Sequence, residues 1–207
     1  MRFILASESP RRIKLFKQFG IDTLDIIPSI TPEVIDESIS PIKAIKKIAK
    51  HKVLDVLKRN RIKEDFCIVG GDTAVIHNYK IIGKPRTQEE AFNTLFSLGG
   101  TSHLVVTGLY VYVKQGEEIK EKSCYSISIV TMRELSQEDI LNYMLLDTFW
   151  DKAGGYSIEE DPLNFIESYQ GSYTNILGFP LEKLSKVFYE LKIKKPHRAV
   201  IKNKKAQ

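Results

Sequence analysis

Serine and arginine side chains gather where an apolar run of the sequence opens into a helix. The run at residues 2–6 is followed by Ser7, Ser9, a proline, Arg11 and Arg12. Free amides at the start of a helix favour anions, and the guanidinium fork of arginine matches phosphate oxygens. The pattern therefore predicts a phosphate site, although a simple helix cap beside two solvated arginines explains these residues equally well.

An aspartate follows a second apolar run, at residues 66–69. The sequence Gly70-Gly71-Asp72-Thr73 is expected to begin where that buried strand ends. Ligands of α/β proteins collect at strand ends, and glycine lets a substrate approach the backbone. At such a place Asp72 can hold a metal ion or orient an attacking water. The alternative is an Asx turn that closes the strand.

Two lysines and one acidic pair complete the candidate charges. Lys84 lies between a glycine and a proline, and Lys52 belongs to a lysine-rich helical segment. Both can neutralise phosphate, although either can also be an ordinary surface lysine. Asp36 and Glu37 form an acidic pair in a loop, and Mg²⁺ prefers carboxylates together with substrate phosphates. Solvated loop acids are the plain alternative.

The loop at residues 151–156, Asp-Lys-Ala-Gly-Gly-Tyr, combines small residues with a charge pair. It is suited to wrap a base or a sugar, or else it is a structural loop. The histidines, by contrast, show no metal-ligand spacing, and His103 in a strand pattern is expected to be a core or edge residue. The sequence has no CxxC pair, Walker-type glycine loop or nucleophile elbow.

The elements that must position these residues alternate early and become strand-rich later. We expect strands at 2–6, 24–30, 66–69, 102–113 and 119–131, a hairpin at 74–82, and helices at 10–19, 41–59, 88–98, from 136 and from 181. This order predicts an α/β protein with a mixed β-sheet and flanking helices.

Composition sets the class of protein. The 207 residues are 43% hydrophobic and 28% charged, and no apolar run approaches the length of a membrane span. Two cysteines in apolar stretches and the lack of a signal-peptide pattern favour the cytoplasm. The net charge of +5 resides in residues 192–207, which carry seven basic residues and no acid, so residues 1–191 carry −2. We therefore expect a single catalytic domain at 1–191, a basic tail at 192–207, and no nucleic-acid binding beyond weak tail contacts.

Taken in order, these segments resemble the Maf-like nucleoside triphosphate pyrophosphatases. The resemblance is carried by LASESPRR at 5–12, GGDT at 70–73, HLVVTG at 103–108, DKAGGYSI at 151–158 and SYTNILGFPL at 172–181. Shorter matches are GKP at 83–85 and ELSQEDI at 134–140. The similarity thus covers nearly the whole chain up to the basic tail. It implies two lobes around a central cleft and a homodimer.

The resemblance also implies an activity and roles for the candidate residues. Water attacks the α-phosphorus of a nucleoside triphosphate and expels pyrophosphate, with the help of a divalent cation (Mg, Mn or Co). Asp72, Lys52 and Lys84 then match the family's catalytic positions, and Asp36, Glu37 and Asp72 its metal site. The matching phosphate-binding residues are Ser7, Ser9, Arg11 and Arg12.

Three positions bear on the choice of base. Arg11 and Thr73 resemble the members that prefer dTTP and UTP, whereas Glu159 stands where those members carry glutamine. The resemblance therefore favours pyrimidine triphosphates. The alternatives are a pyrophosphatase for modified purine nucleotides such as 7-methyl-GTP, a non-enzymatic regulator of septum formation, and a nucleic-acid-binding module.

Overall fold

The computed structural model describes residues 1–21 and 24–195 and contains a seven-stranded mixed sheet. Its order is β2-β1-β3-β5-β6-β7, with β4 paired to β3. The strands are β1 (Arg2–Leu5), β2 (Asp25–Ile26), β3 (Phe66–His77), β4 (Lys80–Ile82), β5 (Ser102–Gln115), β6 (Glu118–Met132) and β7 (Ile166–Gln170). Strand β1 runs parallel to β2 and β3, and the other pairs are antiparallel. The predicted mixed α/β class is confirmed.

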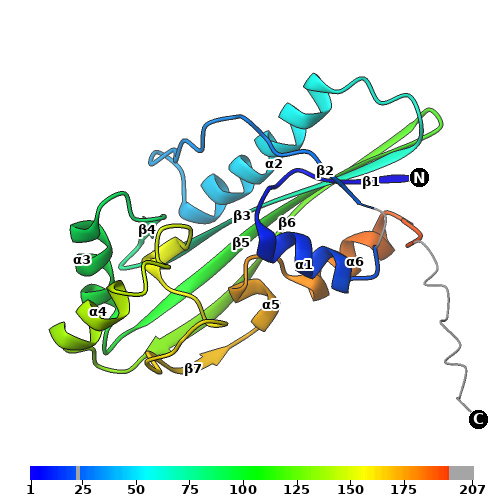
Figure 1. The fold of residues 1–207 in the computed structure, drawn as a ribbon. Helices are drawn as coiled ribbons and strands as arrows, with labels where there is room; N and C mark the ends of the chain where they lie inside the picture. The colour runs from blue at the N-terminus through cyan, green and yellow to red at the C-terminus, as the bar shows by residue number, and fades with distance from the viewer. Residues whose placement is uncertain (22–23, 196–207) are drawn as a thin grey trace, which may run out of the picture.

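The helices divide unequally between the two faces of the sheet (Figure 1). Helix α2 (Pro41–Arg59) covers one face and packs on apolar side chains of β1, β3 and β5. The other face carries α1 (Pro10–Gln18), α3 (Gln88–Leu98), α4 (Gln137–Met144), α5 (Tyr173–Ile176), α6 (Leu181–Glu190) and the 3₁₀ turn η1 (Ala153–Gly155). No helix in the described ranges is long and apolar enough to cross a membrane.

Two apolar cores on this second face form the two lobes. One core joins α1 and α6 to β1, β3 and one half of β5, and the other joins α3 and α4 to the opposite ends of the long strands. Ile193 packs in the first core and Lys195 donates to the carbonyl of Phe19 at 3.0 Å, so the packed body continues beyond residue 191. The rest of the predicted basic tail, residues 196–207, lies outside the described residues.

Most of the helices and strands expected from the sequence are present in the structure. Both Ser-Pro pairs begin helices, at Pro10 and Pro41, and the 74–82 hairpin turns through Asn78 and Tyr79 at positive φ. The strand expected at 24–30 is wrong in length, because only Asp25–Ile26 pairs with β1. Strand β7 and helix α5 were not predicted from the sequence.

The expected strand end at Gly70 is wrong, because Gly70-Gly71-Asp72-Thr73 lies inside β3. Strand β3 pairs with β5 along its whole length, from Phe66 to Ile76. On its other edge, β1 pairs only as far as Val69, and β4 starts only at Val75. The motif therefore occupies a gap in this edge of the sheet. A ligand can reach β3 at the gap, although the strand itself does not end there.

Gly70 and Gly108 leave room for helix α2. The sequence had instead suggested that glycine in this region lets a substrate approach the backbone. A Cβ added at Gly70 would lie 2.5 Å from Cγ2 of Val53 and 3.1 Å from the carbonyl of Ala49, both in α2. A Cβ at Gly108 of β5 would lie 3.0 Å from the carbonyl of Ile45, also in α2. Glycine in a strand interior marks such close backbone approach. Here it lets α2 sit deep on the sheet.

We predict that Gly70→Ala lowers the free energy of unfolding by about 1–3 kcal/mol, because the added methyl overpacks the interface between β3 and α2. Urea denaturation followed by circular dichroism measures the change. Gly83→Ala is the matched control, because no atom lies within 4 Å of a Cβ built there. Equal midpoints for Gly70→Ala and the wild type would show that the close approach of α2 is not required.

Candidate active site

The floor of the site is a cluster of one lysine and two carboxylates. Nζ of Lys52, on α2, lies 2.7 Å from Oδ1 of Asp72 on β3 and 2.6 Å from Oε1 of Glu33. The side chains of Lys52 and Asp72 are each 10% exposed, whereas that of Glu33 is 52% exposed. Two predicted catalytic residues, 20 positions apart in the chain, are thus in direct contact, and one partner opens to solvent.

Glu33 was not among the residues predicted from the sequence. Burial acts to raise its pKa, but the charge of Lys52 and its hydrogen bond, with help from Lys84 and Arg12, leave the pKa below its ordinary value. Glu33 is therefore ionised and faces the cationic side of the site. It lies in the same loop as the predicted acidic pair, and no periodicity in that loop marks which acid turns inward.

Asp36 and Glu37, the predicted metal pair, lie to one side of this cluster. Hydrogen bonds from Ser38 and Lys47 lower the pKa of Asp36 to about 2, and Nζ of Lys47 is 3.0 Å from its Oδ2. Glu37 is exposed, and both acids line another hollow beside α2, which Lys52 also lines. The structure does not bring either acid to Asp72. Their role as metal ligands stays a prediction.

Above the cluster lies a hollow, here called the Lys52 hollow, with the predicted phosphate residues in its wall. Ser7, Ser9, Arg11, Arg12 and Lys84 all line it, together with Glu33, Lys52 and Asp151. Oγ of Ser7 accepts from the amide of Ser9 at 3.2 Å. No side chain caps the first amides of α1, so they remain available to an anion beside the arginines.

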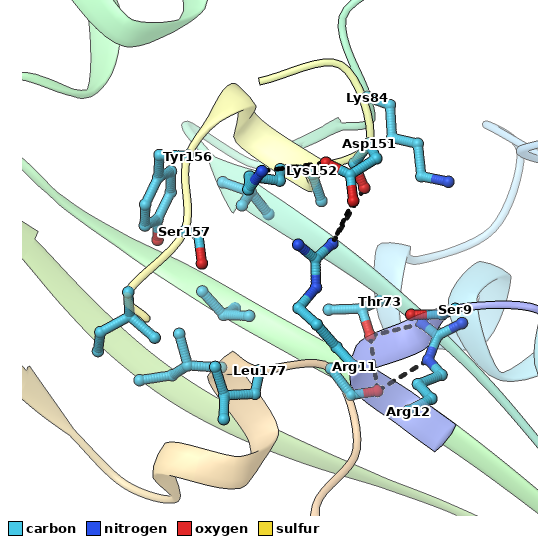
Figure 2. A pocket seen from close by; sticks show the side chains of 16 residues that line it. Ser9, Arg11, Arg12, Thr73, Lys84, Asp151, Lys152, Tyr156, Ser157 and Leu177 are labelled. Atoms are coloured by element: carbon cyan, nitrogen blue, oxygen red, sulfur yellow. Dashed lines mark hydrogen bonds and ion pairs between the residues drawn. The ribbon is translucent and has the colours of Figure 1, made fainter. Parts of the chain in front are cut away.

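Figure 2 shows a second hollow, the Tyr156 hollow. Ser9, Arg11, Arg12, Lys84 and Asp151 line both hollows, which makes them one continuous cleft. The inner wall is formed by Thr73 and Val105, and the outer walls by residues 151–158 and 176–178. The cleft lies between the two lobes, as the resemblance implied.

Two neighbouring residues of β3, Asp72 and Thr73, face opposite sides of the sheet. Successive side chains of a strand point to opposite faces, so Asp72 turns toward α2 and Thr73 toward the Tyr156 hollow. Arg12 lies at the gap between them, where its Nη2 donates to Oγ1 of Thr73 at 2.9 Å and its Nε to the carbonyl of Gly178 at 2.9 Å (Figure 2). Burial lowers the pKa of Arg12, opposed by the charges of Asp72 and Glu33. The arginine is held rigidly beside both carboxylates.

The loop at 151–156 is fixed at both ends. Nη2 of Arg11 donates to the carbonyl of Asp151 at 3.1 Å and lies 3.4 Å from its Oδ2. Lys152 is buried and pairs with Asp151 at 3.1 Å and Glu160 at 3.2 Å. The hydroxyl of Tyr156 lies 2.6 Å from Nε2 of His103 inside the core.

Glu159, the predicted specificity residue that departs from the family pattern, does not line the Tyr156 hollow. Its carboxylate pairs with Nζ of Lys14 on α1. Arg11 and Thr73, the other two specificity residues, both line the hollow. The pairing of Glu159 with Lys14 depends on how α1 packs, so the local sequence gives no sign of it.

These features define an α/β protein of two lobes whose cleft has a cationic wall beside a pair of carboxylates. The chain belongs to the family described as Maf-like protein, whose model matches residues 2–191.

Several relatives of known name are similar over almost their whole length. The chain is 37% identical over 194 residues to a protein of Aquifex aeolicus named dTTP/UTP pyrophosphatase, with 93% of this chain and 97% of that one covered. A protein of the same name from Caldicellulosiruptor saccharolyticus is 36% identical over 191 residues, which are 92% of this chain and 94% of the relative. A solved structure of a HAM1 protein from Coxiella burnetii covers 92% of this chain and 99% of its own, at 14% identity; its TM-score of 0.42 is too low to bear on fold or function.

The buried His103 predicts a pH dependence of stability. Burial lowers its pKa in the folded protein to about 4, from an ordinary value of 6.5. As the pH falls below 6.5, the unfolded chain takes up a proton that the folded chain does not, so stability is lost between pH 6.5 and 4. At pH 5 the His103 contribution is a loss of about 2 kcal/mol relative to pH 7.

Urea unfolding of His103→Gln at pH 7 and pH 5 tests this expectation. The variant should be less stable at pH 7, because Tyr156 loses its partner, but its stability should fall less on acidification than that of the wild type. His51→Gln, at an exposed position on α2, should keep the wild-type pH dependence. The same loss in His103→Gln and the wild type would mean that His103 does not titrate as described.

Proposed function

We propose that the protein hydrolyses nucleoside triphosphates to the monophosphate and pyrophosphate, with a preference for dTTP and UTP. The observation that carries the proposal is the cluster of Lys52, Asp72 and Glu33, of which Lys52 and Glu33 line the same hollow as Arg11, Arg12 and Lys84. The relatives named dTTP/UTP pyrophosphatase support both the reaction and the bases.

The cationic wall holds the triphosphate chain. Phosphoryl transfer depends on positioning and on neutralising charge, and it needs no covalent nucleophile from the protein. Arg12 is fixed by Thr73 and Gly178, so it is already oriented before substrate arrives. The uncapped amides of α1 and the serines before it supply further donors for phosphate oxygens.

The donor set of the cluster fits a hard divalent cation such as Mg²⁺, Mn²⁺ or Co²⁺. Asp72 and Glu33 approach the same atom, Nζ of Lys52, so their oxygens converge on one point. Mg²⁺ binds through one or two carboxylates and completes its shell with water and substrate phosphates. The described residues hold no group of three or more His, Cys, Asp or Glu that would form a full protein cage, which agrees with a site completed by phosphate. When bound, the cation neutralises developing charge on the phosphate oxygens.

In the reaction, a water oxygen forms a bond to the α-phosphorus, and the bond from that phosphorus to the oxygen bridging the β-phosphorus breaks. The electron pair leaves with pyrophosphate. In this proposal Asp72 accepts the proton of the attacking water, and Lys52 and Lys84 neutralise the charge that builds up on the leaving group. The contact of Lys52 with Asp72, and the presence of both lysines in the wall of the Lys52 hollow, support these roles.

The Tyr156 hollow is the site we assign to the base and sugar. Its wall contains the hydroxyls of Thr73 and Ser157 with the apolar side chains of Ile158 and Leu177. Because Glu159 pairs with Lys14, its negative charge is neutralised outside the hollow. The departure from glutamine at this position is therefore compatible with pyrimidine bases.

The cytoplasm is the proposed location, supported by the free thiols of Cys67 and Cys124. The homodimer implied by the resemblance remains a prediction.

Pyrophosphate release measured across a panel of triphosphates with Mg²⁺, Mn²⁺ or Co²⁺ tests the function. We expect the highest kcat/KM for dTTP and UTP, with lower values for GTP and 7-methyl-GTP. In ¹⁸O-water the label should enter the monophosphate, because attack occurs at the α-phosphorus. Label found only in inorganic phosphate would instead establish γ-cleavage, and a best substrate among the purines would refute the pyrimidine preference.

Replacing the acid at the centre of the cluster should remove turnover. We predict that Asp72→Asn lowers kcat by roughly 10²–10⁴-fold without unfolding the protein, because it loses a proton acceptor and a cation ligand. Glu33→Gln should also lower kcat, whereas Asp36→Asn should keep most activity, since its carboxylate is engaged by Ser38 and Lys47. If Asp36→Asn lost most of its kcat while Glu33→Gln stayed active, Asp36 and not Glu33 would be the metal ligand.

A further inference from the structure

The two carboxylates of the cluster are neutralised by one ammonium group. Nζ of Lys52 lies 2.6 Å from Glu33 and 2.7 Å from Asp72, so it occupies the point where their oxygens converge. A divalent cation that used both carboxylates would need this same position. With Lys52 in place, an incoming cation would meet a positive charge only a few ångströms away, which opposes binding.

Lys52 has another place to go when a triphosphate is present. It lines the Lys52 hollow beside Arg12 and Lys84, where phosphate oxygens would supply new acceptors. Its ammonium is a compact charge on a flexible stem, so it can exchange partners without movement of α2. Glu33 is half exposed, so one of its sides is open to an incoming ion. The backbone of α2, in contrast, is held firmly against Gly70 and Gly108.

We propose that Lys52 serves as an internal counter-cation that keeps the divalent metal out until the triphosphate draws its amino group away. This inference rests on the proposed function, because it requires a polyanionic substrate. Metal and nucleotide then bind with positive coupling, and Lys52 carries that coupling. Such coupling is reciprocal, so each ligand raises the affinity for the other by the same factor, typically 5–150-fold.

Removing the ammonium group of Lys52 should therefore let the carboxylates bind a divalent cation without nucleotide. We expect Lys52→Met to bind Mn²⁺ at least about tenfold more tightly than the wild type in the absence of nucleotide. In the wild type, the same gain should appear only when a non-hydrolysable α,β-imido analogue of dUTP is added. In Lys52→Met, the analogue should raise the Mn²⁺ affinity by a smaller factor, because the competing ammonium group is already absent.

Electron paramagnetic resonance of free Mn²⁺ measures these affinities without turnover. Lys47→Met is the matched control, because Lys47 lies on the same helix but pairs with Asp36. A double variant, Lys52→Met with Asp72→Asn, should not show the tighter Mn²⁺ binding expected for Lys52→Met alone. Far-ultraviolet circular dichroism checks the fold, and Lys52→Gln provides a second, polar replacement should the methionine variant fail to fold.

The outcomes separate the inference from the function on which it rests. Unchanged Mn²⁺ affinity in both Lys52 variants would overturn the counter-cation role, even while the wild type still releases pyrophosphate from dTTP. Tighter Mn²⁺ binding in Lys47→Met, but not in the Lys52 variants, would also overturn the counter-cation role of Lys52. It would place the metal at Asp36. If the wild type releases pyrophosphate from no triphosphate, the proposed function fails, whatever the Mn²⁺ affinities show.

Discussion

The ion cluster of Lys52, Asp72 and Glu33 is the interaction on which the site depends. A lysine and an aspartate that are each 10% exposed lose much of their hydration, and a buried pair of this kind is weak evidence for stability. The fold nevertheless provides for it, because glycines at 70 and 108 let α2 approach the sheet closely enough to bring Lys52 against β3. Packing and chemistry are therefore coupled, since a methyl group under α2 would also move the lysine.

The gap in the edge of the sheet is the second constraint. Between the last residue paired with β1 and the first paired with β4, strand β3 pairs on that side with no other strand of residues 1–21 and 24–195. The alternation of side chains then sends Asp72 to one face and Thr73 to the other, and Arg12 reaches across the gap to Thr73. Asp72 thus contacts Lys52 on the side of α2, while Thr73 lines the Tyr156 hollow.

Local chemistry was enough to predict part of this arrangement. The Ser-Pro helix starts and the arginines at the opening of α1 follow from short motifs, whereas the roles expected for Asp72 and Lys52 follow from the family resemblance. The structure brings Asp72 and Lys52 into contact, and Lys52 lines the same hollow as the arginines. The selection of Glu33 over Asp36 does not follow, because it depends on the path of an irregular loop. The continuation of β3 through its glycines depends on pairing with β5, which lies 30 or more residues later in the chain. The pair of Lys14 and Glu159 likewise joins segments 145 residues apart.

We propose that the carboxylates of Asp72 and Glu33 form the metal site of a cleft that holds the triphosphate on its cationic wall. A crystal structure with Mn²⁺ and the α,β-imido analogue of dUTP tests it most directly, because anomalous scattering locates the ion unambiguously. We expect one manganese peak bound by Asp72, Glu33 and phosphate oxygens, with Nζ of Lys52 turned to a phosphate. A peak bound by Asp36 and Glu37, with Lys52 still between Asp72 and Glu33, would contradict it.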